Sequence, residues 1–346
     1  MGITEKFRVG IVGCGAIFPM HAQSLAHTEH AVIAAVCDSK EERAKAAADA
    51  YHCRYYTDYK DMIDSADLHA VHICTPHYLH APMAVYAAGA KKHVMTEKPM
   101  SIDYGDAVAM VNAAREHGVC LGVIFQNHYN PGSVLIKETL QSGALGRVIS
   151  GRITVAWNRD DAYYSESDWK GTWEKEGGGV IINQAIHTLD LMRWFADSGV
   201  DYVDASIHNR MHGGIEVEDC AEGIIAFKNG VTAAFYCNNY SAYDAPVALE
   251  LYCEKGVANI DGDCGTVTFH DGGTLTADTD ADLAAGYGAA MKDYWGVSHV
   301  KQIKNFYEAL SKGVPPDITG DYAAETQKMI AAVYRSGKTG KRVALD

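Results

Sequence analysis

A chain of 346 residues is longer than one ordinary hydrophobic core requires, so we expect two domains. Its 48% hydrophobic content is typical of a soluble globular enzyme, and no apolar run approaches the roughly 20 residues needed to span a bilayer. The net charge of −14 disfavours nucleic acid and anionic membranes as partners.

The first predicted elements form a strand at residues 8–12, a glycine turn, a helix, and a second strand at residues 31–37. Gly13 allows the tight turn, and Gly15 lets backbone N–H groups approach a pyrophosphate at the positive end of the helix. Asp38 ends the second strand, where its carboxylate would accept hydrogen bonds from ribose hydroxyls and repel a 2′-phosphate. This order predicts the first half of a dinucleotide-binding fold that prefers NAD to NADP, although Phe18 stands at the usual third glycine position.

Strands and helices continue to alternate as far as residue 126. Further strands are predicted at residues 70–74, 93–96 and 119–125, with helices between them. This alternation predicts a doubly wound parallel sheet with helices on both faces, a Rossmann domain over residues 1–126. Ligands of such sheets bind at the carboxyl ends of the strands, and six polar or proline residues fall there: Thr75, Pro76, Glu97, Lys98, Gln126 and Asn127.

From residue 127 the predicted elements are mostly strands, which indicates an α+β domain over residues 127–346 with a large, mostly antiparallel open sheet. Asn229 and Gly230 predict a two-residue hairpin turn, in which both positions have φ > 0. A helix at residues 180–196 follows three consecutive glycines. Two C-terminal helices are predicted at residues 298–312 and 321–334, and they could pack back on the N-terminal domain.

The open face of that sheet predicts an oligomer, a homodimer or homotetramer assembled through the C-terminal sheet. The nine cysteines are scattered, without a C-x-x-C pair or metal-ligand spacing. We therefore expect reduced core cysteines, a cytoplasmic location and no metal site.

One candidate chemical group is the tetrapeptide of residues 96–99. Pro99 favours an extended conformation at Lys98, which would then point from the end of a strand toward a bound nicotinamide. A partly desolvated lysine there could exchange a proton with a substrate hydroxyl. A surface lysine paired with Glu97 is an equally good interpretation of the tetrapeptide alone.

The second candidate group is the helix that follows the three glycines. Asn183 and His187 are four residues apart, so on one helix they share a face, and Asp190 lies near enough to orient the imidazole. Histidine is the natural acid or base near neutral pH. A buried structural histidine is the alternative, and the triple glycine together with a second polar side chain on the same face favours function.

Together these residues resemble the Gfo/Idh/MocA oxidoreductase family, which includes glucose–fructose oxidoreductase and inositol dehydrogenase. The resemblance covers nearly the whole chain and rests on matching motifs. These are the G-x-G turn with His21, Cys74-Thr75-Pro76 with His80, His93-Val94 leading to Glu97-Lys98-Pro99, the WKGTW segment at residues 169–173, and the triple glycine followed by His187 and Asp190.

The resemblance implies an NAD(P)-dependent dehydrogenase that acts on a sugar, inositol or sugar derivative bound in the cleft between the domains. Lys98 and His187 would manage the alcohol proton. The implied substrate contacts are Asn183, Lys98, His187, Tyr163 and Trp169, although the aromatic loop that holds Tyr163 and Trp169 is as readily an oligomer contact. The implied cofactor contacts are Gly13, Gly15, Ala16, Ile17, Asp38, Cys74, Thr75, Pro76, His77, His80, Glu97, Lys98 and Gln126.

Asn183 is a departure from the family pattern, because many members carry aspartate four residues before the histidine. Asparagine can hydrogen-bond a hydroxyl but cannot take its proton, so proton transfer would rest on Lys98 and His187 or on a carboxylate elsewhere. A second departure is His128, where an arginine is common. Two alternatives stay open. One is an NAD-dependent glycosidase of the same family that recycles its cofactor; the other, a nucleotide-sensing regulator, is disfavoured because Lys98 and His187 are both present.

Overall fold

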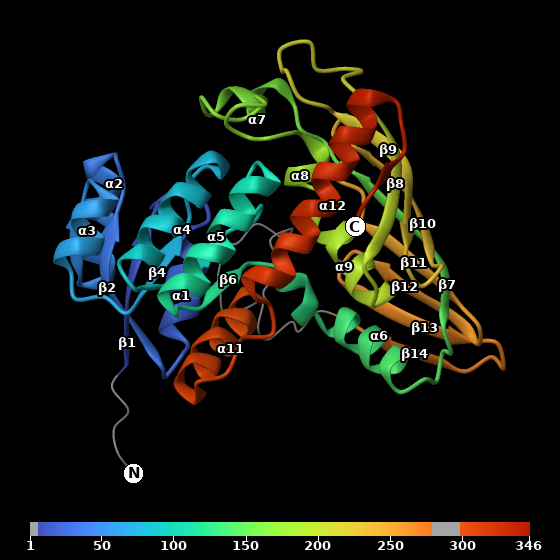
Figure 1. Ribbon diagram of the computed structural model, residues 1–346, viewed down its shortest axis with the longest axis horizontal. Coiled ribbons are helices and arrows are strands. Elements are labelled where there is room, and N and C mark those ends of the chain that lie inside the picture. The colour runs from blue at the N-terminus through green and yellow to red at the C-terminus, as the bar shows by residue number, and fades with distance from the viewer. Residues whose placement is uncertain (1–5, 279–297) are drawn as a thin grey trace. The chain divides into compact units, whose positions relative to one another are not determined.

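The computed structural model describes residues 6–278 and 298–346, and the chain divides into two compact units (Figure 1). Unit 1 comprises residues 1–126 and 285–324, and unit 2 comprises residues 127–284 and 325–346. The first boundary lies between Gln126 and Asn127, where the predicted elements change from alternating strands and helices to mostly strands. Within the described ranges, no helix is long and apolar enough to cross a membrane.

Unit 1 is built on a six-stranded sheet in which every neighbouring pair is parallel, which confirms the predicted doubly wound sheet. The strand order β3-β2-β1-β4-β5-β6 reverses direction between β1 and β4, the point at which such sheets bind ligands. Of these strands, only β3 is not predicted from the sequence, because its three residues are too few to give a clear strand pattern. The strands are β1 (Phe7–Val12), β2 (Ala31–Cys37), β3 (Arg54–Tyr56), β4 (Ala70–Ile73), β5 (His93–Thr96) and β6 (Leu121–Val123).

The helices of unit 1 begin and end where their sequence provides caps. The side chain of Asp58 accepts from the backbone N–H of Lys60 at the start of α3, and Gly118 ends α5 in the left-handed conformation with φ 66°. The late helix α11 packs against α1 and places Phe306 and Tyr307 in the core of this unit. The helices are α1 (Phe18–Ala26), α2 (Glu41–Tyr51), α3 (Tyr59–Ser65), η1 (His77–Leu79), α4 (His80–Gly89), α5 (Tyr104–His117) and α11 (His299–Lys312).

Unit 2 contains a nine-stranded sheet of order β14-β13-β12-β11-β7-β10-β9-β8-β15. Only β7 and β10 pair in parallel, so the predicted mostly antiparallel sheet is confirmed. The strands are β7 (Val148–Ala156), β8 (Val200–His208), β9 (Cys220–Phe227), β10 (Thr232–Asn238), β11 (Ala248–Cys253), β12 (Gly256–Asp261), β13 (Cys264–Phe269), β14 (Thr274–Ala277) and β15 (Val343–Ala344).

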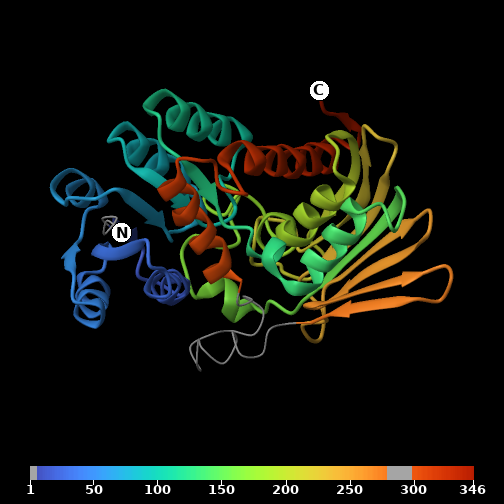
Figure 2. The ribbon, with the colours of Figure 1, turned by 90° about the horizontal axis from the view of Figure 1, so that it is seen from below.

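One face of this sheet is covered by helices. Figure 2 shows α6 (Pro131–Gln141) and α9 (Ile186–Ala196) on the same side of the strands, where α6 packs against β13 and α9 packs against β7. Along β10 the side chains alternate between this covered face, with Phe235 buried, and the opposite face, with Tyr236 exposed. Ile224 and Tyr252 are exposed on that opposite face as well. The remaining helices are η2 (Gln126–Tyr129), α7 (Asp161–Ser165), α8 (Val180–Asn183) and α12 (Gly320–Thr339).

The single helix predicted at residues 180–196 is wrong, because the chain forms α8 and α9 with a break at Gln184 and Ala185. The N–H of Ala185 donates to the carbonyl of Val180 at 2.8 Å, one residue further back than in an α-helix. The side chain of Gln184 accepts from Asn239 at 3.0 Å, which fixes the break. Asn183 and His187 therefore belong to different helices.

The two-residue turn predicted at Asn229 and Gly230 is also wrong. The strands β9 and β10 do form an antiparallel hairpin, but Phe227 pairs with Val231 around a three-residue loop and only Gly230 has positive φ, at 89°. The Asn229 side chain donates to the carbonyl of Ala196 at 2.8 Å and accepts from the N–H of Val231. These two hydrogen bonds hold the longer loop.

Candidate active site

The glycine turn after β1 provides an open backbone surface for a phosphate. Gly13 has φ 93°, and a Cβ there would lie 2.5 Å from the carbonyl oxygen of Cys74, so only glycine fits. Around a Cβ built at Gly15 there is no atom within 4 Å apart from those of Gly15 and its two chain neighbours. Helix α1 begins three residues later and has no acidic residue in its first turn. An anion can therefore approach the backbone at Gly15 and at the start of α1 without meeting an acidic residue of that helix.

Phe18 does not obstruct this turn, although it replaces the usual third glycine. Its side chain is buried in the core of unit 1 and contacts Tyr51 edge to face, with ring centroids 5.7 Å apart. The aromatic ring thus packs away from the turn and helps to anchor α1.

Asp38 is fixed beside the glycine turn by two backbone hydrogen bonds. Its Oδ2 accepts from the N–H of Cys14 at 2.8 Å, and its Oδ1 accepts from the N–H of Lys40 at 2.9 Å. Each carboxylate oxygen can accept more than one hydrogen bond, so Asp38 keeps the capacity to accept ribose hydroxyls. The residues of this edge are suited to the adenosine and pyrophosphate of a dinucleotide.

The segment after β4 is joined to the segment after β5 by His80. This imidazole is buried, with Nδ1 2.7 Å from the carbonyl of Pro99 and Nε2 2.8 Å from the carbonyl of Thr75. Burial lowers the pKa of His80, although both carbonyl contacts act in the opposite direction. His80 therefore holds two predicted cofactor-binding loops together, and its direct contact with a cofactor stays a prediction, as do those of Cys74, Pro76 and His77.

Glu97 and Lys98 follow directly after β5, at the carboxyl edge of the sheet. The Lys98 side chain is half-buried, its peptide bond to Pro99 is cis, and its N–H donates to Glu97 Oε2 at 3.2 Å. This hydrogen bond is made by the backbone of Lys98, so it does not decide between the two interpretations of the tetrapeptide. Gln126, the buried first residue of η2, follows β6 by three residues at the same edge of the sheet.

Beneath this edge runs a buried chain of titratable groups. Glu97 Oε1 lies 2.8 Å from His21 Nε2, His21 Nδ1 lies 2.8 Å from His72 Nδ1, and His72 Nε2 lies 2.8 Å from the Tyr307 hydroxyl. His299 Nε2 approaches the same Glu97 oxygen at 3.5 Å. All five groups are buried. The chain links β4, β5, α1 and α11, and it gives His21 a carboxylate partner that the G-x-G motif alone did not reveal.

The histidine partners of Glu97 decide its ionisation. Burial alone would raise the pKa of Glu97, but the hydrogen bonds from His21 and His299 more than offset it and hold the pKa well below the usual value. Burial lowers the pKa of His72 well below its usual value. A continuous series of hydrogen bonds thus runs from the Tyr307 hydroxyl through His72 and His21 to the Glu97 carboxylate.

In unit 2, predicted substrate contacts gather around a buried glutamate. Asn183 Nδ2 donates to Glu176 Oε1 at 2.7 Å and to the Tyr163 hydroxyl at 3.1 Å. Gln184 Nε2 donates to the same hydroxyl at 3.3 Å. The Lys170 ammonium lies 3.6 Å from the centre of the Tyr163 ring. The structure thus brings Asn183 and Tyr163 together and adds Glu176, which the sequence analysis did not single out.

Two of the three glycines before α8, Gly178 and Gly179, are required by the chain itself. Gly178 has φ 155° and a Cβ there would overlap the Tyr334 hydroxyl, while a Cβ at Gly179 would overlap the carbonyl of Glu218. The Glu218 carboxylate accepts from the N–H groups of Gly179 and Ile181 at 2.9 and 3.0 Å and from Tyr334 at 2.9 Å. The close approach that the glycines indicated is therefore made by the segment just before β9 and by Tyr334 of α12, both in unit 2.

The imidazole that Asp190 contacts is that of His128, not that of His187 as the sequence suggested. Asp190 Oδ2 lies 2.6 Å from His128 Nε2, while Oδ1 accepts from Thr326 and lies 3.6 Å from Arg193. Burial raises the pKa of Asp190, but His128 and Arg193 together lower it by more than burial raises it, so the pKa lies below its usual value. His128 also stacks on Trp194 at 4.1 Å, which gives this departure from the family pattern a structural role.

His187 is half-buried near the start of α9, and Trp169 is half-buried in the segment between α7 and α8. The carbonyl of Trp169 accepts from the Thr172 hydroxyl at 3.0 Å, so this segment is held by local contacts. The sequence offered no signal for Glu176, because in Glu174-Lys175-Glu176 it reads as one of several surface charges. His72 was hidden within an apolar strand.

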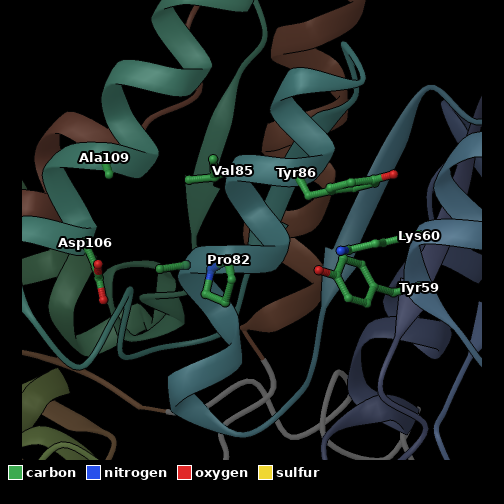
Figure 3. Close-up of a pocket in the computed structure, with 8 residues that line it drawn as sticks. Tyr59, Lys60, Pro82, Val85, Tyr86, Asp106 and Ala109 are labelled. Atoms are coloured by element: carbon green, nitrogen blue, oxygen red, sulfur yellow. The ribbon is translucent and has the colours of Figure 1, made fainter.

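A surface depression of about 430 Å³ lies elsewhere in unit 1, among α3, α4 and α5 (Figure 3). Tyr59 and Tyr86 meet edge to face at 5.6 Å beside it, and the Lys60 ammonium lies 5.3 Å from the Tyr86 ring. Pro82 and Asp106 line the opposite side. None of the predicted cofactor or substrate contacts lines this depression.

Comparisons with known proteins identify the family. Residues 7–125 match the model "Oxidoreductase family, NAD-binding Rossmann fold", and residues 134–259 match the Gfo/Idh/MocA C-terminal domain. An uncharacterized oxidoreductase of Bacillus subtilis, YrbE, is 28% identical over 99% of this chain and 98% of its own. Myo-inositol 2-dehydrogenase of Thermotoga maritima is 24% identical over 91% of both chains.

Among solved structures, the WlbA dehydrogenase of Bordetella pertussis in complex with NADH and UDP-GlcNAcA is 28% identical over 99% of both chains, with a TM-score of 0.85. Two family models match consecutive parts of this chain, and the relatives are similar to it over nearly its full length. These matches indicate the same family as the sequence motifs and the two observed sheets. The chain therefore belongs to the Gfo/Idh/MocA family of NAD-dependent oxidoreductases.

Proposed function

We propose that this protein is an NAD-dependent dehydrogenase that oxidises a hydroxyl-bearing carbon of a sugar, an inositol or a sugar derivative. The observation that carries the proposal is the fixed Asp38 carboxylate beside the open backbone of Gly15, because together they suit a dinucleotide without a 2′-phosphate. The similarity to myo-inositol 2-dehydrogenase and to a dehydrogenase bound to UDP-GlcNAcA supports a polyhydroxylated substrate.

The residues that would hold NAD are those at the carboxyl edge of the unit 1 sheet: Gly13, Gly15, Ala16, Ile17, Asp38, Thr75, Pro76 and Gln126. When bound, the nicotinamide ring supplies the hydride acceptor. An NADP phosphate would lie against Asp38, so we expect NADP to be used less well. This preference follows from a charge that two backbone N–H groups keep in place.

The alcohol proton is the part of the reaction that the protein must handle. Oxidation of CH–OH to C=O releases one hydride to the cofactor and one proton, and we assign the proton to Lys98 and His187. Both side chains are half-buried, as groups that meet substrate and exchange protons with water must be. Asn183, Tyr163 and Trp169 would then bind other hydroxyls and a face of the substrate ring.

The test is a panel of inositols, aldoses, glycosides and UDP-linked sugar acids, each mixed with the protein and NAD. NADH absorbance and free sugar release are followed in parallel. NADH formed with a polyol or sugar derivative supports the dehydrogenase and names the substrate class. Sugar release without net NADH would instead identify an NAD-dependent glycosidase, and the absence of both, despite measurable NAD binding, would contradict either enzyme.

We also propose that the unit 2 sheet forms the contact of a homodimer or homotetramer in the cytoplasm. Ile224, Tyr236 and Tyr252 are exposed on one face of a broad sheet, where such apolar side chains commonly meet another subunit. All nine cysteines are free thiols, as expected in a reducing compartment. Light scattering that gives a monomeric mass would contradict the oligomer.

A further inference from the structure

Glu176 is a buried carboxylate that faces a predicted substrate-binding side chain. Its side chain is buried, with the residue 1% exposed, directly before the three glycines. One oxygen accepts from the N–H of Gly171, and the other accepts from Asn183 Nδ2 at 2.7 Å. Burying a carboxylate is costly, and these two donors are uncharged. A packing role alone would be met at lower cost by an apolar or amide side chain.

The contact fixes which atoms Asn183 presents. A carboxylate only accepts hydrogen bonds, so the amide nitrogen of Asn183 must face Glu176, and the same nitrogen also donates to the Tyr163 hydroxyl at 3.1 Å. Both N–H bonds of the amide are thereby engaged within unit 2. Toward any further partner Asn183 acts through Oδ1, which is a hydrogen-bond acceptor.

We propose that Glu176 is a positioning residue of the dehydrogenation: it orients Asn183 to accept a hydrogen bond from a substrate hydroxyl, and it places a negative charge behind that amide. The pair would thus recognise a polyol or sugar hydroxyl as a donor, as an aspartate at position 183 would, while the charge stays buried. This inference rests on the proposed function, because it assigns Asn183 to the substrate.

The ionisation state of Glu176 changes near neutral pH. Burial raises the pKa of Glu176 to about 7, although the Gly171 N–H and the Asn183 amide lower it. The other charged or titratable groups around it are Lys170, whose charge lowers this pKa, Glu218, whose charge raises it, and the tyrosines Tyr163, Tyr164 and Tyr334.

The direction of the pH effect follows from this arrangement. Above about pH 7 the carboxylate is ionised and Asn183 presents its oxygen. Below that pH, Glu176 carries a proton that it must donate, and the Asn183 amide turns so that its oxygen faces the glutamate. The substrate hydroxyl then meets an N–H instead of an acceptor. We therefore expect kcat/KM for oxidation to fall as the pH drops through about 7.

The decisive variant is Glu176→Gln, which keeps the size and removes the charge. The new amide faces Asn183 with its own N–H, so Asn183 must turn and present a donor. We expect kcat/KM at pH 8 to fall by about 10- to 100-fold, since a mispaired buried polar group costs about that factor, mostly through KM. The part of the pH dependence near 7 that comes from Glu176 should disappear with it, while any part that comes from Lys98 and His187 should remain.

The exchange variant Glu176→Gln with Asn183→Asp restores the hydrogen bonds among positions 171, 176, 183 and 163. The negative charge then lies on position 183 instead of position 176. The introduced glutamine accepts from Gly171 through its oxygen and donates through its amide to the introduced aspartate. The Tyr163 hydroxyl turns so that it donates to the same aspartate. This double variant should recover to within about tenfold of the wild type, which a purely structural role for Glu176 does not predict.

Glu218→Gln is the matched control, because Glu218 is equally buried in unit 2, and burial likewise raises its pKa to about 7. Its partners are the backbone N–H groups at α8 and Tyr334, not Asn183, so the variant should keep a pH-dependent kcat/KM. The midpoint should move to lower pH, because the charge of Glu218 no longer raises the pKa of Glu176. A readout without cofactor or substrate is the infrared carboxyl band of the free protein. Its component that titrates near pH 7 should lose intensity in Glu176→Gln and in Glu218→Gln.

The outcomes separate the two proposals. If the wild type oxidises no substrate with NAD, the proposed function fails, whereas the infrared titration still tests the state of Glu176. If the wild type is active and Glu176→Gln keeps its KM and its pH profile, the inference is wrong. It is equally overturned if the exchange variant is no more active than Glu176→Gln while both remain folded by circular dichroism.

Discussion

The buried contact between Glu97 and His21 predicts a specific loss of stability in unit 1. Substitution Glu97→Gln keeps one acceptor oxygen for His21 but places an amide where the second oxygen receives the N–H of Lys98. It also removes the charge that faces His299 at 3.5 Å. A hydrogen bond to a charged group contributes about 1.5–3 kcal/mol, and the removed desolvation cost offsets part of it, so we expect a net destabilisation of about 2 kcal/mol at pH 7.

The pH dependence of this loss identifies its cause. The pKa of Glu97 in the folded protein lies well below its usual value, so the ionised carboxylate contributes stability that is fully present above the unfolded value of about 4.3. That contribution disappears as the pH falls through the folded pKa. The difference between wild type and Glu97→Gln should therefore be constant above about pH 5 and should shrink at lower pH.

Hydrogen exchange of backbone amides in β4 and β5 is the appropriate assay. Four of the five tryptophans, at positions 157, 169, 173 and 194, belong to unit 2, so tryptophan fluorescence reports mainly on the other unit. The control is Asp67→Asn, which removes an exposed ion pair with Arg8 at 2.9 Å and should change protection by less than about 1 kcal/mol. A loss in Glu97→Gln that is the same at pH 7 and at pH 3.5 would refute the assignment of charge to Glu97.

Three further variants test the remaining assignments. Lys98→Ala should lower turnover by about 10²- to 10⁴-fold in steady-state assays and leave NAD affinity, measured by calorimetry, nearly unchanged; near-normal turnover would remove Lys98 from the chemistry. Asp38→Ser combined with Ser39→Arg should raise the ratio of kcat/KM for NADP to that for NAD, and an unchanged ratio would count against the ribose role. Gly178→Ala should destabilise unit 2 by about 3 kcal/mol in urea unfolding followed by tryptophan fluorescence, because the new methyl group overlaps a buried tyrosine. The control Gly143→Ala, which has open space around it, should destabilise the protein by only about 1 kcal/mol. Equal losses of stability in the two variants would contradict the steric argument.

The sequence predicted the sheets well because their signals are local. The strands β2 and β5 begin and end at the predicted residues, and α5 ends at a glycine, Gly118, in the left-handed conformation. Each of these features depends on side chains within a few positions of one another. A short apolar run or a glycine after a helix is therefore enough to specify them.

The errors occur where a distant group decides a local conformation. The hairpin after β9 is longer than Asn229 and Gly230 predicted because the Asn229 side chain bonds to the end of α9. The helix after the three glycines breaks because Gln184 is held by Asn239, 55 positions away. Neither partner can be recognised from the residues next to the turn or the break.

The chain from Glu97 to Tyr307 shows the same limit for the site. His21 and Glu97 are 76 positions apart, and His72 and Tyr307 are 235 positions apart. The sequence showed that His21 and Glu97 follow predicted strand ends, but only the fold shows that their side chains meet. Asp190 illustrates the opposite case, since the sequence assigned it to a neighbour on its own helix and the structure pairs it with His128.

Glu97 and Glu176 are both buried carboxylates behind a predicted functional side chain, yet their pKa values move in opposite directions. Burial raises both, and the partners decide the outcome: two imidazoles offset it at Glu97, whereas at Glu176 the amide and backbone donors are weaker and the charge of Glu218 adds to the rise. Glu97 therefore stays ionised throughout the physiological range, as a fixed support beside Lys98 should. Glu176 changes its charge within that range, so of the two it is the one whose protonation can alter how a substrate hydroxyl is recognised.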